Sequence, residues 1–423
     1  MATKDKKIKV LAYCDMACAT GFATVAKNIL MGLHNSGAFE ITVLGINHHG
    51  NPHPFPFPIW PVLINAGSSR DPYGREWAKK MFMQMEYDIL FTLQDSFILE
   101  FMKEIIADMR NRNPKMRWIN YFPVDGVPKK AWIEAMSKAD YVFTYTDWGV
   151  KMCSEVFPPI KEKIAAVPHG INQMDFFPLP KSEKEKFRRD FFGPHTDKFV
   201  VLNVNRNQQR KDLPRSMQAF KKFNAARPNS VYYIHAAVQD HGWNLFDVAS
   251  NMGLRVNENI CFPDGLNPNQ GYPINIVNNI YNAADVVISS TLGEGWGLAQ
   301  IEAMATCTPV ISPDNTACSE ILADDRGILV RSGWDEEAFT VLCHDNEINR
   351  PLSHIGDMAN ALIKLHDDKN ERQRLAINGY KWVTSTLRWD KNIVPLWEKV
   401  FSEAVKSAVS TPEFVPGLSL VEI

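Results

Sequence analysis

The sequence predicts an α/β protein built from two domains, each with a parallel sheet covered by helices. Three observations lead to this prediction. A chain of 423 residues exceeds one ordinary core and suits two α/β domains. Short apolar runs of strand length alternate with helical patterns along the chain, which is typical of βαβ units. Residues 285–312 contain one such unit in full, as strand, glycine-rich loop, helix and strand.

Composition narrows the class of protein. The chain is 45% hydrophobic and 22% charged, as expected for a soluble globular protein. A formal net charge of -2 does not support a broad nucleic-acid surface, although a local basic groove stays open. No apolar run approaches the ~18–20 residues that a membrane helix requires. The seven cysteines are scattered without a metal-binding spacing, so we expect reduced thiols and a cytoplasmic location.

The first half reads as a series of strands and helices. Strands are expected at 8–13, 41–47, 87–95, 117–126 and 139–149. A helix is expected over 22–33, and Gly21 stands at its start, where free N–H groups are available. The run at 51–61 alternates proline with aromatic residues. It cannot be a central strand or a helix, because proline removes hydrogen-bond donors, so we expect an extended loop.

Polar residues at expected strand ends are the candidates for function in this half. Asp95 and Asp125 each end a strand, and ligand sites of open parallel sheets lie at the carboxyl ends of strands. Asp125 has two open interpretations: it accepts a proton or orients a hydroxyl group of a ligand, or it caps the next helix. His169 is likewise open, either as part of a tight turn at Gly170 or as a group that faces a ligand.

The second half begins with a charged segment, 181–198, expected to be a solvated helix between domains. A strand follows at 199–204, and a loop with Arg206 and Lys211 leads into a helix near Leu213. Further strands are expected at 230–238 and 257–265, and helices at 274–283, 354–386 and 393–405.

The most informative stretch is the glycine-rich loop from Thr291 to Gly297, which precedes a helix. Such a loop brings backbone N–H groups and the positive end of a helix to one point, which suits an anion such as a diphosphate. Glu294 and Glu302 flank that point. A carboxylate beside a phosphate is repulsive unless it binds hydroxyl groups, which donate hydrogen bonds to it. The pattern therefore predicts a nucleotide-sugar site.

The run EGWGLAQIEAMA, followed by TPVIS, resembles the donor-site signature of retaining glycosyltransferases of the family 4 type, the glycosyl transferases group 1. The resemblance is specific in the second half and looser in the first. It implies the GT-B fold: two Rossmann-like domains facing a central cleft, with a C-terminal helix that crosses back to the first domain. One departure is Thr306-Cys307, where the family usually has Cys-Gly.

The resemblance also implies a division of the chain. Residues 1–178 would form the acceptor-side domain and 179–198 a linker. Residues 199–388 would form the donor domain, and 389–423 the crossover helix and a tail.

Roles for individual residues follow from the resemblance. Glu294 would lie by the donor sugar and Glu302 would hold the ribose hydroxyls. Arg206 and Lys211 would hold the diphosphate, with Arg210 as a stand-in for either. The remaining donor-side candidates are Gly21, Gly295, Trp296, Gly297 and Leu298 near the phosphates, and Phe262, Pro263 and Asp264 near the base. We expect Arg206, Lys211, Glu294 and Asp125 to act in catalysis.

The implied reaction moves a sugar from a UDP- or GDP-linked donor to an acceptor hydroxyl with retention of configuration. No cofactor or metal is expected, because no Asp-x-Asp pair ends a strand in the second domain and cations are present to replace it. The acceptor class stays open: a glycan, a lipid, a small molecule, a protein or a hydroxylated DNA base. Two alternatives also stay open, an epimerase or phosphorylase on the same fold and an inactive nucleotide-sugar-binding scaffold.

Overall fold

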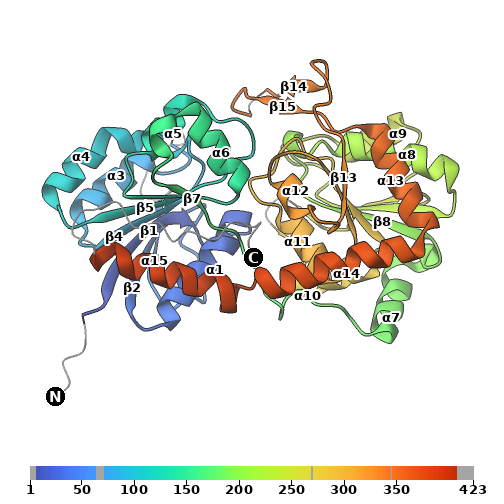
Figure 1. Ribbon diagram of the computed structural model, residues 1–423. Coiled ribbons are helices and arrows are strands. Elements are labelled where there is room, and N and C mark those ends of the chain that lie inside the picture. Colours follow the sequence, from blue (N-terminus) through green and yellow to red (C-terminus); the bar gives the residue numbers. More distant parts are fainter. Residues whose placement is uncertain (1–5, 63–70, 268–269, 344, 407–423) are drawn as a thin grey trace. The chain divides into compact units, whose positions relative to one another are not determined.

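The computed structural model describes residues 6–62, 71–267, 270–343 and 345–406 (Figure 1). The chain forms two compact units. Unit 2 is the continuous segment Gly170–Arg388, whereas unit 1 combines the chain up to His169 with the chain from Trp389 onward. The tail expected after the last helix lies outside the described residues.

Unit 1 contains, within its described residues, a seven-stranded sheet in the order β3-β2-β1-β4-β5-β6-β7, and all neighbouring strands are parallel. The strands are β1 (Ile8–Asp15), β2 (Phe39–Ile46), β3 (Ile59–Pro61), β4 (Ile89–Leu93), β5 (Arg117–Tyr121), β6 (Tyr141–Thr144) and β7 (Ile164–Ala166). The inner strands β4, β5 and β6 are buried along almost their whole length, as expected for a parallel sheet covered on both faces.

Helices cover both faces of this sheet. They are α1 (Gly21–Asn35), α3 (Arg75–Gln84), α4 (Met102–Arg112), α5 (Lys130–Met136), α6 (Asp147–Val156) and α15 (Val394–Lys406). Figure 1 shows α3 to α6 on one face, and α1 with α15 on the other. Thr20 begins α1 by accepting a hydrogen bond from Ala23 N at 3.1 Å, and Thr146 begins α6 by accepting one from Gly149 N at 3.0 Å.

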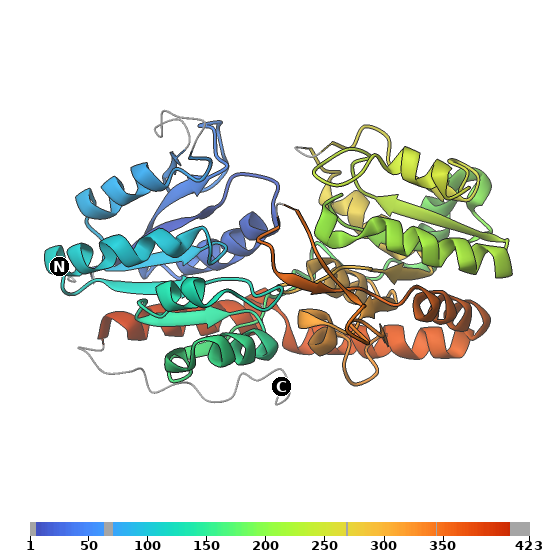
Figure 2. The same cartoon turned by 90° about the horizontal axis from the view of Figure 1, so that it is seen from above.

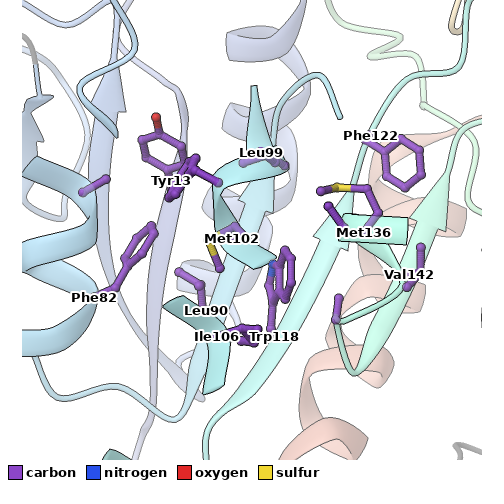
Figure 3. Packing of buried hydrophobic residues seen from close by; sticks show 14 of the residues in the cluster. Tyr13, Phe82, Leu90, Leu99, Met102, Ile106, Trp118, Phe122, Met136 and Val142 are labelled. Carbon is purple, nitrogen blue, oxygen red and sulfur yellow. The ribbon is translucent and has the colours of Figure 1, made fainter. Parts of the chain in front are cut away.

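The core on the α3–α6 face is shown in Figure 3, where Tyr13, Phe82, Met102 and Trp118 lie among aliphatic side chains. Trp118 Nε1, which is buried in this core, donates to Thr92 Oγ1 at 2.9 Å.

On the opposite face, α15 belongs to unit 1 and fills the core beside α1. Trp397 and Phe401 of this helix are fully buried. The Trp397 ring centroid lies 4.9 Å from that of Tyr121 and 5.7 Å from that of Phe91. The predicted return of the last helix to the first domain is therefore confirmed.

Unit 2 contains, within its described residues, a six-stranded parallel sheet in the order β10-β9-β8-β11-β12-β13. The strands are β8 (Phe199–Val204), β9 (Ser230–His235), β10 (Ile260–Cys261), β11 (Val286–Ile288), β12 (Val310–Pro313) and β13 (Ile328–Val330). A separate antiparallel pair joins β14 (Phe339–Val341) to β15 (Asn349–Pro351). The prediction of two parallel-sheet α/β domains is thus confirmed.

The helices of unit 2 also lie on both faces of its sheet, as the turned view of Figure 2 shows. They are α7 (Lys181–Phe192), α8 (Leu213–Ala226), α9 (Leu245–Asn251), α10 (Ile274–Ala283), α11 (Leu298–Ala305), α12 (Thr316–Ile321), α13 (Ile355–Asp367) and α14 (Lys369–Thr386). Helices α8, α9 and α13 pack together, and so do α10, α11 and α14.

Several expected elements differ from the structure. The proline-rich run at 51–61 is not loop throughout, because Ile59–Pro61 forms the edge strand β3, where Pro58 O accepts a hydrogen bond from Val43 N at 3.0 Å. Proline is tolerated there because an edge strand pairs on one side alone. The strand expected at 257–265 shortens to Ile260–Cys261, and that expected at 139–149 ends at Thr144, because Thr146 already caps α6.

Candidate functional site

The candidate site of unit 2 lies where β8 and β11 end, since these neighbouring parallel strands finish at the same edge of the sheet. The loop after β11 leads directly into α11. Its last glycine, Gly297, has φ 122, a conformation that favours glycine, and a Cβ there would approach Gln300 Oε1 to 2.9 Å. No side chain caps α11. Gln300 N already donates to Gly297 O at 3.1 Å, which leaves the N–H groups of Leu298 and Ala299, in the first turn, available to an anion.

Lys211 and Glu294 form the centre of this site. Lys211 Nζ donates to Glu294 Oε1 at 2.5 Å, and the side chains are only 13% and 9% exposed. Arg210 Nη1 lies 3.4 Å from Glu294 Oε2 and also donates to Gly293 O. Burial acts to raise the pKa of Glu294, but the charges of Lys211 and Arg210 outweigh it and hold that pKa below its usual range. With Lys211 and Arg210 protonated, two cations share one ionised carboxylate and the cluster is positively charged, although burial lowers the pKa of Lys211 against the opposing charge of Glu294.

The loop around Glu294 is held by hydroxyl groups. Glu294 N donates to Thr316 Oγ1 at 2.9 Å, and Thr291 Oγ1 donates to Gly293 O at 2.9 Å. Thr316 was not expected to take part. It adopts φ 47, an uncommon backbone conformation for threonine that sequence reasoning does not anticipate.

Glu302 lies in α11 and is partly buried. Tyr281 of α10, which is fully buried, donates its hydroxyl to Glu302 Oε2 at 2.9 Å. Burial raises the pKa of Glu302 to about 7, with the charge of Asp175 adding to the rise and the hydrogen bond from Tyr281 opposing it. Glu302 is therefore a carboxyl group that changes charge near neutral pH.

Arg206 does not contact the Lys211–Glu294 pair. Its Nε and Nη2 atoms donate to the two carboxylate oxygens of Asp240 at 3.1 and 3.0 Å. The Arg206 side chain is 44% exposed, whereas that of Asp240 is 2% exposed. Arg210, named as a stand-in from the sequence, is the arginine that the structure brings to Glu294.

The residues expected near the base follow β10, at the edge of the sheet. The Phe262 ring packs against Phe246, with centroids 5.3 Å apart. Asp264 O accepts a hydrogen bond from the Tyr272 hydroxyl at 2.7 Å. The Tyr272 ring in turn packs against the His235 ring, with centroids 5.0 Å apart. Burial lowers the pKa of His235 to about 4, so this histidine is neutral near pH 7.

In unit 1, the expected acceptor-side residues follow adjacent strands. Asp95 and Asp125 lie two and four residues beyond the ends of β4 and β5, not at the strand ends as expected. Helix α5 begins after Lys129 without a side-chain cap, so Asp125 is not its N-cap. Burial raises the pKa of Tyr145, at the end of β6, well above the ordinary value, and the charges of Asp95 and Asp125 add to the rise. The two carboxylates therefore act on the same tyrosine.

A polar cluster that sequence reasoning missed lies at the end of β1. Asp15, 2% exposed, accepts from Thr20 Oγ1 at 2.6 Å and from Asn47 Nδ2 at 3.2 Å. The adjacent Gly21 is the first residue of α1 and is exposed.

His169 packs inside unit 1. Its ring centroid lies 4.1 Å from that of Tyr145 and 5.6 Å from that of Tyr121. Burial lowers its pKa to about 3, so the ring is neutral. This surrounding favours the structural interpretation of His169.

Among the described residues, no group of three or more His, Cys, Asp or Glu side chains could hold a metal ion. No helix in the described part of the chain has the length and apolar character needed to cross a membrane.

Comparison with solved structures reveals close agreement in fold. A structure of Anabaena Alr3699/HepE in complex with UDP and glucose aligns with a TM-score of 0.65 at 13% identity, covering 94% of this chain and 99% of that one. Sucrose-phosphate synthase from Thermosynechococcus elongatus aligns with a TM-score of 0.69 at 16% identity, with the same coverage. The chain has the GT-B fold.

Sequence comparison matches parts of this GT-B chain to a family model and to known proteins. Residues 184–354 match the family model described as glycosyl transferases group 1. The putative glycosyltransferase EpsD of Bacillus subtilis is 26% identical over 263 residues, 57% of this chain and 60% of that protein. A D-inositol 3-phosphate glycosyltransferase of Stackebrandtia nassauensis is 24% identical over 251 residues, 57% of this chain and 50% of that protein. The matched region thus spans about half to three fifths of these relatives.

Proposed function

We propose that this protein is a glycosyltransferase that moves a sugar from a nucleotide-diphosphate sugar to an acceptor hydroxyl. The observation that carries the proposal is the cluster of Lys211, Arg210 and Glu294 beside the uncapped start of α11. This cluster lies at the carboxyl edge of the unit 2 sheet, inside the segment that matches the group 1 family model. Its positive charge suits a diphosphate, and its carboxylate suits the hydroxyl groups of a sugar.

The cluster supports a mechanism without a protein nucleophile. The acceptor oxygen forms a bond to the anomeric carbon on the face that the diphosphate leaves, while the bond from that carbon to the phosphate oxygen breaks. The leaving phosphate oxygen takes the acceptor proton, so configuration is retained. The diphosphate gains negative charge as it departs, and fixed cations stabilise that charge more in the transition state than in the ground state. Lys211, Arg210 and the start of α11 would supply this stabilisation, and we therefore propose metal-independent catalysis.

Glu302 and its partner Tyr281 would hold the ribose of the donor. A ribose hydroxyl donates to an ionised carboxylate, and the Tyr281 hydroxyl already orients the Glu302 side chain.

The HepE structure contains UDP and glucose, which supports a uridine-linked donor here. For the acceptor, we propose the carboxyl edge of the unit 1 sheet, where Asp95 and Asp125 follow neighbouring strands. The seven free thiols support a cytoplasmic location.

The deciding experiment is a panel of UDP-, GDP- and ADP-sugars, assayed by thermal shift and by release of nucleoside diphosphate, with and without EDTA. We expect one nucleotide sugar to raise the melting temperature and to be hydrolysed slowly without an acceptor, regardless of EDTA. Glu302→Ala should weaken donor binding in calorimetry. If no nucleotide sugar binds the wild-type protein, the proposed donor site is wrong. If EDTA stops turnover of a bound donor, metal independence is wrong.

A further inference from the structure

Unit 2 has a cavity at the opposite edge of its sheet from Glu294. Its volume is about 510 Å³. Asp285 and Pro309 line it, and they directly precede β11 and β12. These strands are parallel, so residues before them lie at the amino edge of the sheet, whereas Glu294 follows β11 at the carboxyl edge. The cavity is therefore separate from the proposed nucleotide-sugar site.

Helix α14 presents one of its faces to this cavity. Its lining residues are Lys369, Arg372, Gln373, Ala376 and Ile377. They recur at intervals of three and four residues, the spacing of one helical face. Two cationic side chains, Lys369 and Arg372, lie on this face, whereas the start of the helix is capped by Asp368, which accepts a hydrogen bond from Glu371 N at 2.9 Å.

Helix α7 adds a third cation, Lys184, and is fixed beside the cavity by Arg188. Arg188 Nη2 donates to Asp285 Oδ2 at 2.9 Å, and Arg188 Nε donates to Thr196 O at 2.8 Å. Asp285 Oδ2 also accepts from Val200 N at 2.8 Å. The acidic group in the wall is thus already neutralised by Arg188, and the lining keeps a net positive charge.

Lys184 forms no direct ion pair among the described residues, although the charge of Asp285 acts on it. Its side chain is partly buried, and its ammonium makes no hydrogen bond or ion pair within the described part of the chain. Burial lowers the pKa of Lys184. The nearby negative charge of Asp285 opposes this decrease, and the positive charge of Arg372 adds to it. Partly buried charges are normally paired, so this ammonium is set up to receive an anion.

Cys307 also lines the cavity and is partly buried. Its backbone φ is 57, in the left-handed region that favours glycine. A cysteine at this position adds a thiol where a glycine would have no side chain. The thiol is suited to report on the cavity, because an occupant would cover it. Cys343, in contrast, is exposed and does not line the cavity.

We propose that this cavity binds a small molecule carrying at least two negative charges, as phosphate or carboxylate groups, between Lys184, Lys369 and Arg372. The apolar wall formed by Ala284, Pro309 and Ala376 would accept an aliphatic part of the same molecule. The proposal concerns a second ligand site and does not depend on the nucleotide-sugar assignment.

The test follows alkylation of Cys307 by iodoacetamide in the full chain, measured by peptide mass spectrometry, with Cys343 as the internal control. Inorganic pyrophosphate and citrate are the two probes, since they distinguish phosphate from carboxylate recognition. UDP is present throughout to occupy the proposed donor site, and sodium chloride matches the ionic strength. We expect one probe to slow alkylation of Cys307 about tenfold when its concentration is about ten times its dissociation constant, with Cys343 unchanged.

Variants connect the protection to the cations. Lys369→Gln removes an exposed charge, and Lys184→Met removes the partly buried one while keeping its aliphatic stem. Together they should weaken the protecting probe at least about tenfold, the loss expected for two charge-assisted hydrogen bonds. Equal protection in the double variant, or no protection of wild-type Cys307 by either probe, overturns the proposal. If Cys307 resists alkylation without any probe, calorimetry of the same probes against wild type and Lys369→Gln decides, and equal affinities overturn it.

Discussion

Lys211 Nζ lies 2.5 Å from Glu294 Oε1, and neither side chain is more than 13% exposed. The two residues come from loops that follow neighbouring strands, and 83 positions separate them in the chain. A bound diphosphate would compete with Glu294 for the Lys211 ammonium. The pair therefore couples the proposed sugar-binding carboxylate to the proposed phosphate-binding cation, and substitution of either should affect the other.

Loss of the Lys211 cation should impair turnover. We expect Lys211→Ala to lower kcat by about 10²–10³, the effect of removing one group that stabilises transition-state charge. Lys222→Ala, an exposed lysine on α8, serves as the matched control and should leave kcat unchanged. Steady-state kinetics with the donor found in the nucleotide-sugar panel provide the measurement. A Lys211→Ala enzyme with near wild-type kcat would contradict the assignment.

The same pair should show coupling in stability. Glu294→Gln leaves Lys211 and Arg210 together without their carboxylate, whereas Glu294→Gln with Lys211→Met removes both charges of the pair. We expect a coupling energy of about 1–3 kcal/mol between the two positions in urea unfolding. Additive effects, within about 0.5 kcal/mol, would show that the contact does not matter to folding.

Glu302 should make stability depend on pH. Its pKa of about 7 in the folded protein exceeds the ordinary value of 4.5, so the folded state holds more protons than the unfolded state between these pH values. Its contribution to stability therefore falls as pH rises through that window. The side chain of Glu302→Gln cannot ionise, so this variant does not lose that contribution. Between about pH 5 and about pH 8, the free energy of unfolding of Glu302→Gln should rise relative to that of wild type by on the order of 1–3 kcal/mol.

Urea unfolding at several pH values measures this difference. Glu183→Gln, an exposed residue of α7, is the control and should show a constant difference from wild type. The expectation for Glu302 is wrong if its variant and wild type keep a constant difference across the window.

Asp125 separates donor from acceptor effects. Because it does not cap α5, we propose that Asp125 orients the acceptor hydroxyl, and we expect Asp125→Asn to lower turnover with acceptor by about 10²-fold, the loss expected when a reacting group is misplaced by about 1 Å. Donor affinity, measured by calorimetry, should stay at the wild-type value, since Asp125 belongs to unit 1 and the donor cluster to unit 2. Unchanged turnover with acceptor would assign Asp125 a purely structural role.

The last helix should be essential to the core of unit 1. Trp397 contacts the rings of Phe91, Tyr121 and Phe143 and is fully buried. We expect Trp397→Ala to lower the free energy of unfolding by about 3–5 kcal/mol. Trp334→Ala, at a tryptophan that is 40% exposed, should cost far less. Comparable losses in the two variants would contradict this view of α15.

Local signals predicted much of the fold. The bounds expected for β8 and α10 match the structure, because a run of buried β-branched and apolar residues and a helical period are both contained in the segment itself. Strand β5 was overestimated because its apolar character continues past Tyr121 through Phe122 and Val124, into the loop that carries Asp125. Strand β4 was overestimated at both ends: the expected 87–95 includes Tyr87 and Asp88 before Ile89, and the polar Gln94 and Asp95 after Leu93.

Partners distant in sequence could not be predicted in the same way. Arg206 finds Asp240 on the loop after β9, and nothing near Arg206 in the chain indicates that carboxylate. Tyr281, which holds Glu302, comes from the preceding helix, α10, and nothing near Glu302 in the chain indicates this partner. Asp15 gathers Thr20 and Asn47 because β1 and β2 are paired, and that pairing is a property of the assembled sheet.

The division of unit 1 between the two ends of the chain affects how the protein is made. The ribosome releases the chain from the N-terminus, so Phe39 and Phe91 leave it long before Trp397 and Phe401, which cover them in the finished core. All of unit 2 is synthesised in the interval. Unit 2 can therefore complete its fold while unit 1 still exposes an apolar face. During this interval the exposed face makes the nascent chain prone to aggregation and available for binding by chaperones.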